Sequence, residues 1–308
     1  MNEETTQYKS AKTRSIKNFF TDILHGCCIG VAFIIPGFSG GSVAAILGIY
    51  EKLVDAIANI FKDFKRNILT LLPIFLGMVI GIVSLLFPLG WALESFPLPT
   101  VSLFVGLAIG GLPSVTDKLK GKIKAPNAIA FLIPLLAAAA ISFLPTGSEV
   151  NLFNLNFGGY VLLFLVGIIG SAALVVPGIS GSMLLLIFGY YNPIVNMVTD
   201  HFFKGDDVGI SIAVLGCTVL GICVGFVIIS KIMSVLLKKF PRGTYFAILG
   251  FIIGSVPTIY VSTAKDAGYT VQGLPSSAFY WIMCAVMLAI GFVISFALVL
   301  ISKKKLPQ

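Results

Sequence analysis

Long apolar stretches, separated by short polar segments, make up most of the chain. Six of the stretches are continuous and meet or approach the roughly 20 residues that a helix needs to cross a bilayer. These six lie at 68–93, 98–115, 127–144, 208–230, 244–263 and 277–301. Two further stretches, at 23–50 and 159–191, are each interrupted by a hexad rich in Pro and Gly. The pattern predicts six transmembrane helices and two broken, re-entrant helical hairpins, at 23–61 and 159–198.

The composition supports an all-α membrane protein that crosses the bilayer several times. Of the 308 residues, 57% are hydrophobic and 11% are charged, whereas a soluble domain has about 45–50% apolar and about 25% charged residues. The apolar stretches are continuous, which excludes the alternating pattern of an outer-membrane barrel. The 5 Cys lie in apolar stretches without CxxC spacing, so we expect small hydrophobic side chains there, and neither a metal nor a cofactor.

Positive charge predicts the orientation, because loops rich in Lys and Arg stay in the cytoplasm. The polar segment 1–21 is basic and is placed inside. Following the spans from there, all of the 21 Lys and Arg except Lys204 and Lys265 fall on the cytoplasmic side. We therefore expect a multi-pass protein of the cytoplasmic membrane with both termini in the cytoplasm. The net charge of +8 reflects this topology rather than a nucleic-acid partner.

The second half of the chain repeats the first with a shift of 141 residues. The matching positions are Pro36, Gly37, Ser39, Gly40, Ile46, Gly48, Tyr50 and Val54 in the first half and Pro177, Gly178, Ser180, Gly181, Ile187, Gly189, Tyr191 and Val195 in the second. Each half contains a returning hairpin and three crossings, so it ends on the side opposite its start. This predicts an inverted repeat of two halves of about 140 residues, 22–145 and 146–308, as in secondary transporters.

The two hexads form the candidate substrate site. In each, Pro-Gly is predicted to end one short helix and Ser-Gly to start the next, and a helix start offers free N–H groups and about half a positive charge. Two such starts would suit a phosphate or carboxylate without any charged side chain. The candidate binding residues are Pro36, Gly37, Ser39, Gly40, Gly41, Ser42, Tyr50, Pro177, Gly178, Ser180, Gly181, Ser182 and Tyr191.

His25 and Glu51 are candidates for coupling transport to protons, because they flank the first hairpin near the membrane. Both residues would also be explained as interfacial groups in contact with water. Tyr50 and Tyr191 have a similar alternative, since tyrosines commonly anchor helices at the membrane interface. The sequence does not identify a coupling ion.

Small residues four positions apart predict close helix packing. Such pairs are Gly77 with Gly81, Gly106 with Gly110, and Gly250 with Gly254, and Gly216 with Gly221 is a similar pair.

The Pro-Gly-x-Ser-Gly-Gly…Gly-x-Tyr run at 36–50 and its counterpart at 177–191 resemble the polyprenyl-phosphate transporter family of prokaryotes, the PopT-type undecaprenyl-phosphate translocases. The resemblance covers about 16–305. It implies a transporter, not an enzyme, that returns undecaprenyl phosphate from the outer to the cytoplasmic leaflet so that cell-wall synthesis can reuse this lipid carrier. Ser182 stands where the first hexad has Gly41, so the two tips are not expected to be equivalent.

Other functions are weighed against this one. The same neutral site would serve a secondary transporter of a small soluble anion such as phosphate. Gly-x-Ser-Gly at 37–40 and 178–181 also matches rhomboid-type intramembrane serine hydrolases. That chemistry needs a base beside the serine, and the 2 His, at 25 and 201, lie outside the six spans. A lipid phosphatase would need clusters of His, Arg and Lys that the sequence lacks.

Overall fold

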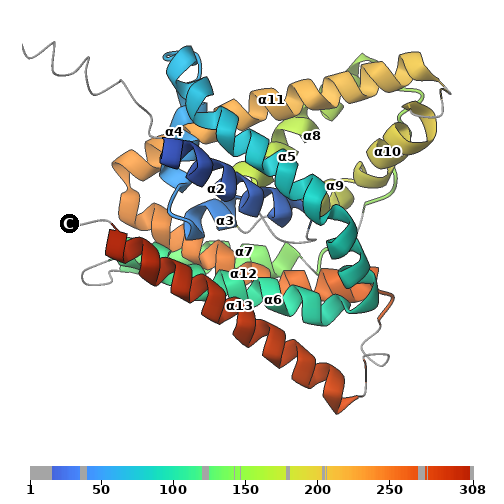
Figure 1. Ribbon diagram of the computed structural model, residues 1–308. Helices are drawn as coiled ribbons and strands as arrows, with labels where there is room; N and C mark the ends of the chain where they lie inside the picture. Colours follow the sequence, from blue (N-terminus) through green and yellow to red (C-terminus); the bar gives the residue numbers. More distant parts are fainter. Residues whose placement is uncertain are drawn as a thin grey trace, which may run out of the picture.

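The computed structural model describes residues 16–34, 40–119, 125–141, 143–145, 147–177, 181–202, 205, 207–269, 275 and 277–305. Within these residues the fold is helical, without strands (Figure 1). The longer helices are α2 (Ile16–Ile34), α5 (Phe64–Ser95), α6 (Pro97–Thr116), α7 (Ala125–Ile141), α8 (Phe157–Val175), α11 (Val208–Lys239), α12 (Pro241–Asp266) and α13 (Ala278–Lys305). The short ones are α3 (Gly40–Ile46), α4 (Tyr50–Ala58), η1 (Asp117–Leu119), α9 (Gly181–Ile187), α10 (Tyr191–Asn196) and the π-helical turn η2 (Met197–Phe202).

Six of the described helices, α5, α6, α8, α11, α12 and α13, are long and apolar enough to cross a membrane. The protein is therefore an all-α polytopic membrane protein, as predicted. Each predicted continuous span falls on one helix, although α7 has only 17 residues and is shorter than the other five. The sixth long helix is instead α8, the 19-residue first arm of the second broken stretch.

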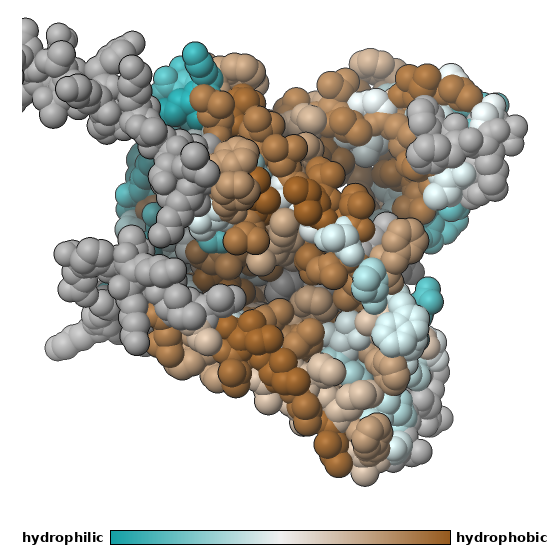
Figure 2. All heavy atoms as spheres, in the orientation of Figure 1, coloured by the Kyte–Doolittle hydropathy of each residue, from teal (hydrophilic) through white to brown (hydrophobic). Residues whose placement is uncertain are grey.

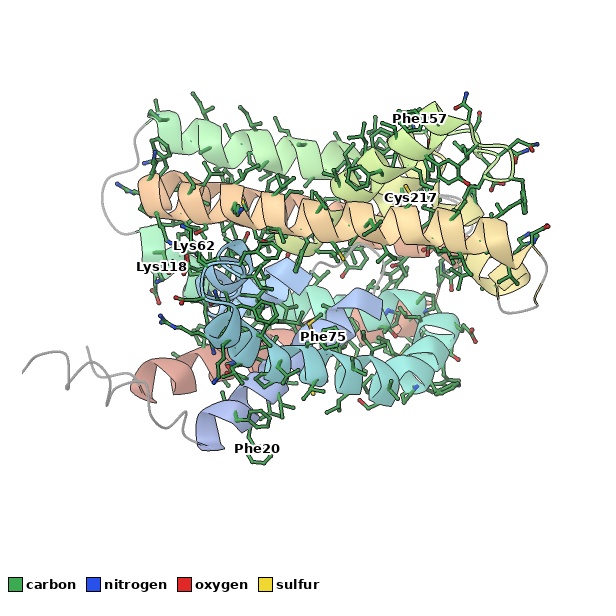
Figure 3. The ribbon with its side chains drawn as sticks, turned by 90° about the horizontal axis from the view of Figure 1, so that it is seen from above. Phe20, Lys62, Phe75, Lys118, Phe157 and Cys217 are labelled. Carbon is green, nitrogen blue, oxygen red and sulfur yellow. The ribbon has the colours of Figure 1, made fainter. Side chains whose placement is uncertain are left out.

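The hydrophobic surface is what a bilayer requires. In the space-filling view, hydrophobic side chains cover the middle of the visible face, and hydrophilic ones gather toward its two ends (Figure 2). The side-chain view places Lys62 and Lys118 together at one end of the molecule and Phe157 at the other (Figure 3). We call these the lysine-rich end and the α10 end, because α10 also lies at the latter (Figure 1).

The long helices pack in pairs, in two layers (Figure 1). In one layer α2 packs along α5 and α8 along α11. In the other layer α6 packs along α13 and α12 along α7, and α6 also contacts α12. Each pair of this second layer joins a helix from before residue 146 to one from after it. The two halves of the chain are thus interleaved rather than folded as separate domains.

Glycines allow the paired helices to approach closely. An added Cβ at Gly77, Gly106 or Gly250 would lie within 2.0–2.2 Å of a carbonyl oxygen of the neighbouring helix, which leaves no room for a side chain. The predicted close packing is confirmed at these positions. At Gly216 it was wrong, because an added Cβ there would meet nothing within 4 Å, whereas Gly221 faces α8.

A left-handed glycine divides the return arm of the first broken stretch. Gly48 has φ +71°, its N–H donates to Ala45 at 3.1 Å, and the N–H of Ile49 donates to Ala44 at 3.0 Å. These two bonds form a Schellman motif, in which a glycine past the helix end satisfies the last carbonyls. Helix α3 therefore stops at this glycine, and α4 begins two residues later at Tyr50.

The same turn recurs in the second half. Gly189 has φ +75°, and it and Tyr190 donate to Leu186 and Leu185 at 3.0 and 2.9 Å. The repeated Gly-x-Tyr is therefore a helix stop followed by a helix start, which here is α10 at Tyr191. The helix bounds also repeat, since α9 ends 141 residues after α3 and α10 begins 141 residues after α4. That the second half is inverted in the membrane stays a prediction.

Alanine at either turn glycine should destabilise the protein, but unequally. A left-handed conformation costs a residue with a Cβ about 1–2 kcal/mol. At Gly48 the added Cβ meets open space, whereas at Gly189 it would also lie 2.0 Å from the carbonyl oxygen of Ser148. We expect Gly189→Ala to lower the unfolding temperature in detergent clearly more than Gly48→Ala does. Equal shifts would contradict the close approach at Ser148.

Candidate functional site

The two broken stretches meet inside the protein. Gly40, Gly41 and Ser42, in the first turn of α3, are buried. A Cβ added at Gly41 would lie 2.9 Å from the carbonyl oxygen of Val175 and 3.2 Å from the nitrogen of Pro177. Pro177 is itself buried. The start of α3 is thus seated against the second hexad, at a distance that only glycine allows.

A hydrogen bond from Tyr50 stabilises the contact between the two broken stretches. Its side chain is 2% exposed, and its hydroxyl donates to the carbonyl oxygen of Val175 at 2.9 Å. That carbonyl belongs to the last turn of α8, whose final carbonyls have no partner within the helix. Tyr50 therefore satisfies a backbone group at the break in the other stretch. In this structure it joins the two tips, and its contact with a substrate stays a prediction.

The second tip is more open than the first. Gly181, at the start of α9, is only partly buried, and Ser182 follows it in the same helix. Tyr191 does not join the tips but lines a cavity of about 170 Å³ together with Glu149 and Asn192. The remaining predicted binding residues lie outside the described residues. They are Pro36, Gly37, Ser39, Gly178 and Ser180.

The two hairpins are packed unequally. In the first half, α4 lies against α11, and α3 lies against both α6 and α8. By the repeat, the counterparts of these pairs would be α10 with α5, α9 with α12, and α9 with α2. Among the described residues none of the three counterpart pairs packs to a similar extent. The first hairpin is therefore enclosed by helices from both halves, and the second is not.

Polar contacts tie α4 to α11 at the lysine-rich end. The carboxylate of Asp55 accepts hydrogen bonds from the ammonium of Lys238 and from the hydroxyl of Ser234, the latter at 3.1 Å. The side chain of Asp55 is half exposed. An exposed pair of this kind contributes only about 0.2–1 kcal/mol, so it can be made and broken at small cost.

Two further charged residues of α4 bind other helices. The hydroxyl of Tyr245 on α12 donates to the carboxylate of Glu51, and the Nζ of Lys118 lies 3.8 Å from the same carboxylate. Lys52 donates to Asp22 of α2 at 2.7 Å. Together with the Asp55 contacts, these define what we call the α4 clamp. It holds α4 to α2, the other arm of the first hairpin, and to α11 and α12.

The two candidate coupling residues lie in or beside the α4 clamp. Glu51 is part of it. His25 is half buried in α2, one turn from Asp22, and its Nδ1 is buried with no hydrogen-bond partner in the described part of the chain. Their role in coupling stays a prediction. Sequence reasoning missed the pairings of Asp55 with Lys238 and of Glu51 with Tyr245. The sequence did contain a signal for these pairings. Glu51 and Asp55 are acidic residues one helical turn apart, on the side of the protein where most Lys and Arg are predicted to lie.

This architecture defines a class of protein, namely a polytopic helical membrane protein whose interrupted helices meet inside, as in secondary transporters. Residues 29–273 match the family described as VCA0040-like, undecaprenyl phosphate translocase-like, and the chain belongs to this family. The family resemblance inferred from the two hexads is therefore confirmed.

Two relatives carry the name polyprenyl-phosphate transporter. The protein from Staphylococcus aureus is 28% identical over 288 residues, which cover 90% of this chain and 95% of the relative. The protein from Vibrio cholerae serotype O1 is 27% identical over 258 residues, which cover 79% of this chain and 78% of the relative. No solved structure matches the chain.

Acid should open the α4 clamp at Asp55. The hydrogen bond from Lys238 holds the pKa of the Asp55 carboxyl below its usual value, which is about 3.9. A carboxyl with a lowered pKa stabilises the fold above the unfolded-state value, and this stability is lost as the pH falls through the folded-state value. We therefore expect Asp55→Asn to lower the unfolding temperature at pH 7, with the difference from wild type shrinking as the pH falls below about 4 and vanishing only below the lowered pKa of the folded state. Lys238→Met should give the same profile, and a difference that persists in acid would contradict the pairing.

Proposed function

We propose that the protein is a polyprenyl-phosphate transporter that returns undecaprenyl phosphate from the outer to the cytoplasmic leaflet of the cytoplasmic membrane. The observation that carries the proposal is the seating of Gly41 against Pro177, in a chain of the undecaprenyl phosphate translocase-like family. Two relatives of similar length bear the matching name. The proposed role is movement of the lipid without chemical change, with both termini in the cytoplasm.

The phosphate group is proposed to bind where the tips meet. Glycines at 40, 41 and 181 allow a ligand to come close to backbone N–H groups, and Ser39 and Ser180 would add hydroxyl donors. The charges of the α4 clamp are held at the lysine-rich end, in pairs with one another. A site of neutral donors releases an anion more readily than one with a full opposite charge, which suits a carrier.

Unequal packing of the hairpins supports an outward-facing state. The α4 clamp closes the lysine-rich end, which the charge pattern places in the cytoplasm. Transport would then require the clamp to open and the α10 end to close. The repeat supplies a counterpart of the Asp55–Lys238 pair that could close the α10 end. Asn196 corresponds to Asp55 with the shift of 141, and Glu94 corresponds to Lys238 with a shift of 144. We infer that the amide of Asn196 donates to Glu94 in the inward-facing state.

Cysteine cross-linking tests this exchange in a protein whose 5 native Cys have been replaced. A short methanethiosulfonate cross-linker should readily bridge cysteines at 55 and 238 and lock the outward-facing state, since a long Lys side chain makes this contact and a direct disulfide needs Cα atoms within about 7 Å. The same reagent should bridge cysteines at 94 and 196 slowly, and faster when the clamp is weakened by Glu51→Gln. Either cross-link should stop transport, and a reductant should restore it. Free transport with the 55–238 cross-link intact would contradict the exchange.

Glu51 offers a route for proton coupling. Protonation would remove its ion pair with Lys118, and so would favour opening of the α4 clamp. We expect Glu51→Gln to transport lipid without responding to an imposed pH gradient across proteoliposomes. A gradient response equal to that of wild type would exclude Glu51 and leave His25 as the proposed coupling residue.

Transport in proteoliposomes tests the function and the site together. We expect purified protein to deplete labelled undecaprenyl phosphate from the outer leaflet, and Gly41→Ala to reduce the rate at least tenfold, because its Cβ would press on the backbone at Val175. Gly216→Ala is the matched control, since its Cβ meets nothing within 4 Å, and it should transport normally. Uptake of inorganic phosphate without lipid movement would favour the transporter of a small soluble anion.

A further inference from the structure

We propose that two apolar cavities beside the first tip hold the isoprenoid chain of the substrate, one cavity extending toward each leaflet. The inference rests on the proposed function and adds the path of the lipid chain to it.

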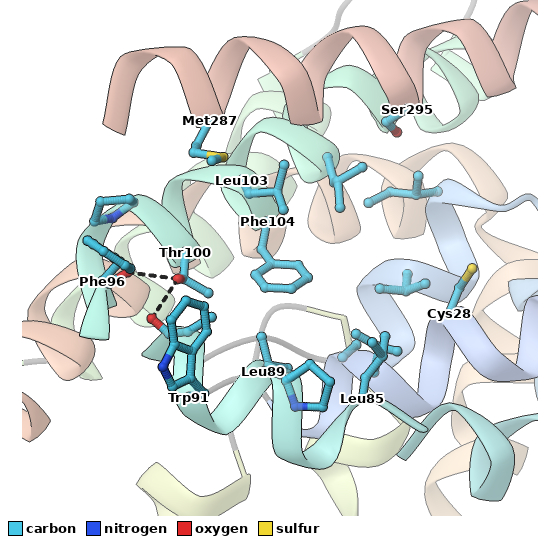
Figure 4. A pocket seen from close by; sticks show the side chains of 18 of the residues that line it. Cys28, Leu85, Leu89, Trp91, Phe96, Thr100, Leu103, Phe104, Met287 and Ser295 are labelled. Carbon is cyan, nitrogen blue, oxygen red and sulfur yellow. Dashed lines mark hydrogen bonds between the residues drawn. The ribbon is translucent and has the colours of Figure 1, made fainter. Parts of the chain in front are cut away.

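The larger cavity has a volume of about 750 Å³ and opens between α2 and α5 on one side and α6 and α13 on the other (Figure 4). Val43 and Ile46 of α3 form part of its wall, about half a turn and one and a half turns after the tip at Gly41. Leu103 and Met287 face them from α6 and α13. The cavity therefore begins at the helix that carries the proposed phosphate site.

The wall of this cavity favours hydrocarbon. Its lining is almost entirely apolar, and Thr100 contributes one of the few polar groups. The hydroxyl of Thr100 already donates to the carbonyl oxygens of Phe96 at 2.7 Å and Ala92 at 3.0 Å. The flexible thioether of Met287 can adapt to an irregular branched chain. The volume is in the range of about 300–1,000 Å³ typical of small-ligand sites, so only the isoprene units nearest the phosphate would fit.

A second cavity, of about 500 Å³, lies on the other side of the tip. Gly40 at the first tip and Leu174 in the last turn of α8 both line it. Leu71 and Phe75 of α5 and Phe226 of α11 form much of the remaining wall. Like the first cavity it is apolar, and Gly40 brings its wall to the first tip.

The two cavities lie at different depths in the membrane. The larger one contacts α5 between residues 85 and 92, and the smaller one between residues 68 and 78. With a rise of about 1.5 Å per residue, their midpoints are roughly 20–25 Å apart along α5. The cavities approach each other near the first tip, because Ile29 of α2 lines the smaller one and Cys28 and Val31 line the larger one. With the predicted orientation, the larger cavity extends from the tip toward the outer leaflet and the smaller one toward the cytoplasmic leaflet.

This arrangement fits a lipid whose head crosses the membrane more than it fits resident bilayer lipid. A phosphate at the tip can keep its first isoprene units in the larger cavity before transport and in the smaller one afterwards. Neither position requires the chain to leave an apolar surface. A bilayer lipid has its head at the membrane surface, so it would not need apolar cavities that converge on a buried tip.

Photolabelling tests where the chain binds. The probe is a polyprenyl phosphate with a diazirine on the isoprene unit next to the phosphate, added to the protein in nanodiscs. We expect labels at Leu103 and Met287, and at Leu71 and Phe226, that excess undecaprenyl phosphate removes and excess phosphatidylglycerol does not. Labels spread over lipid-facing residues, or removed equally by phosphatidylglycerol, would show that bulk lipid fills the cavities and would overturn the inference.

Filling each cavity tests its use in transport. Met287→Trp and Leu71→Trp should each lower the rate of undecaprenyl-phosphate movement at least tenfold. The matched controls are Val286→Trp and Val79→Trp, at positions that are 49% and 44% exposed on the same helices and should stay within twofold of wild type. The unfolding temperature of all four variants is first compared with that of the wild type. If a variant fails to fold, the photolabelling pattern of the wild-type protein decides whether that cavity binds the chain.

The outcomes separate this inference from the proposed function. If the wild type transports lipid and Met287→Trp and Leu71→Trp transport it normally, the proposed binding of the isoprenoid chain in the cavities is overturned and the proposed function stands. An inactive wild type would count against the proposed function, and the photolabelling would still decide the chain sites because it measures binding.

Discussion

The breaks in two helices are the constraint on which the rest of the structure depends. Backbone groups that a break leaves unpaired cost several kcal/mol each in lipid, so irregular backbone at membrane depth must be packed within protein or line a cavity. Here the start of α3 is seated against Pro177, and the Tyr50 hydroxyl satisfies the carbonyl of Val175 at the end of α8. The contact between the two stretches thus satisfies one backbone carbonyl at the end of α8.

Interleaved packing of the two halves provides the frame for this meeting. The pairs α6–α13 and α7–α12 each join the first half to the second. At Gly106 and Gly250 a carbonyl oxygen of the partner helix lies so close that a Cβ atom would not fit. Such close packing resists deformation. At the lysine-rich end, by contrast, α4 is held to α11 and η1 by the exposed pairs Asp55–Lys238 and Glu51–Lys118, which can be exchanged at little cost. The buried Asp22 holds Lys52 to α2 within the first broken stretch. A rigid frame with weakly clamped hairpins is consistent with the carrier proposed above.

Several parts of the site were readable from the sequence because they depend on local chemistry. The repeated Gly-x-Tyr was visible as a motif, and the structure gives its reason, a left-handed turn at Gly48 and Gly189 that favours glycine. The hexads correctly indicated the family. Gly216 shows the limit of such reasoning, because the same residue type and nearly the same spacing as at Gly250 led to open space rather than to a helix contact.

Hydrophobic length and charge are summed over neighbouring residues, so the spans and the helical class could be inferred without coordinates. Which helices pair is different, since it depends on side chains that are distant in the chain. The contacts of Asp55 with Lys238 and of Tyr50 with Val175, and the cavities on either side of α3, arise only when α11, α8 and α13 come together around the first hairpin. These contacts could not be predicted from local sequence, because the partners are more than 100 residues apart and the residues next to each partner carry no sign of the other.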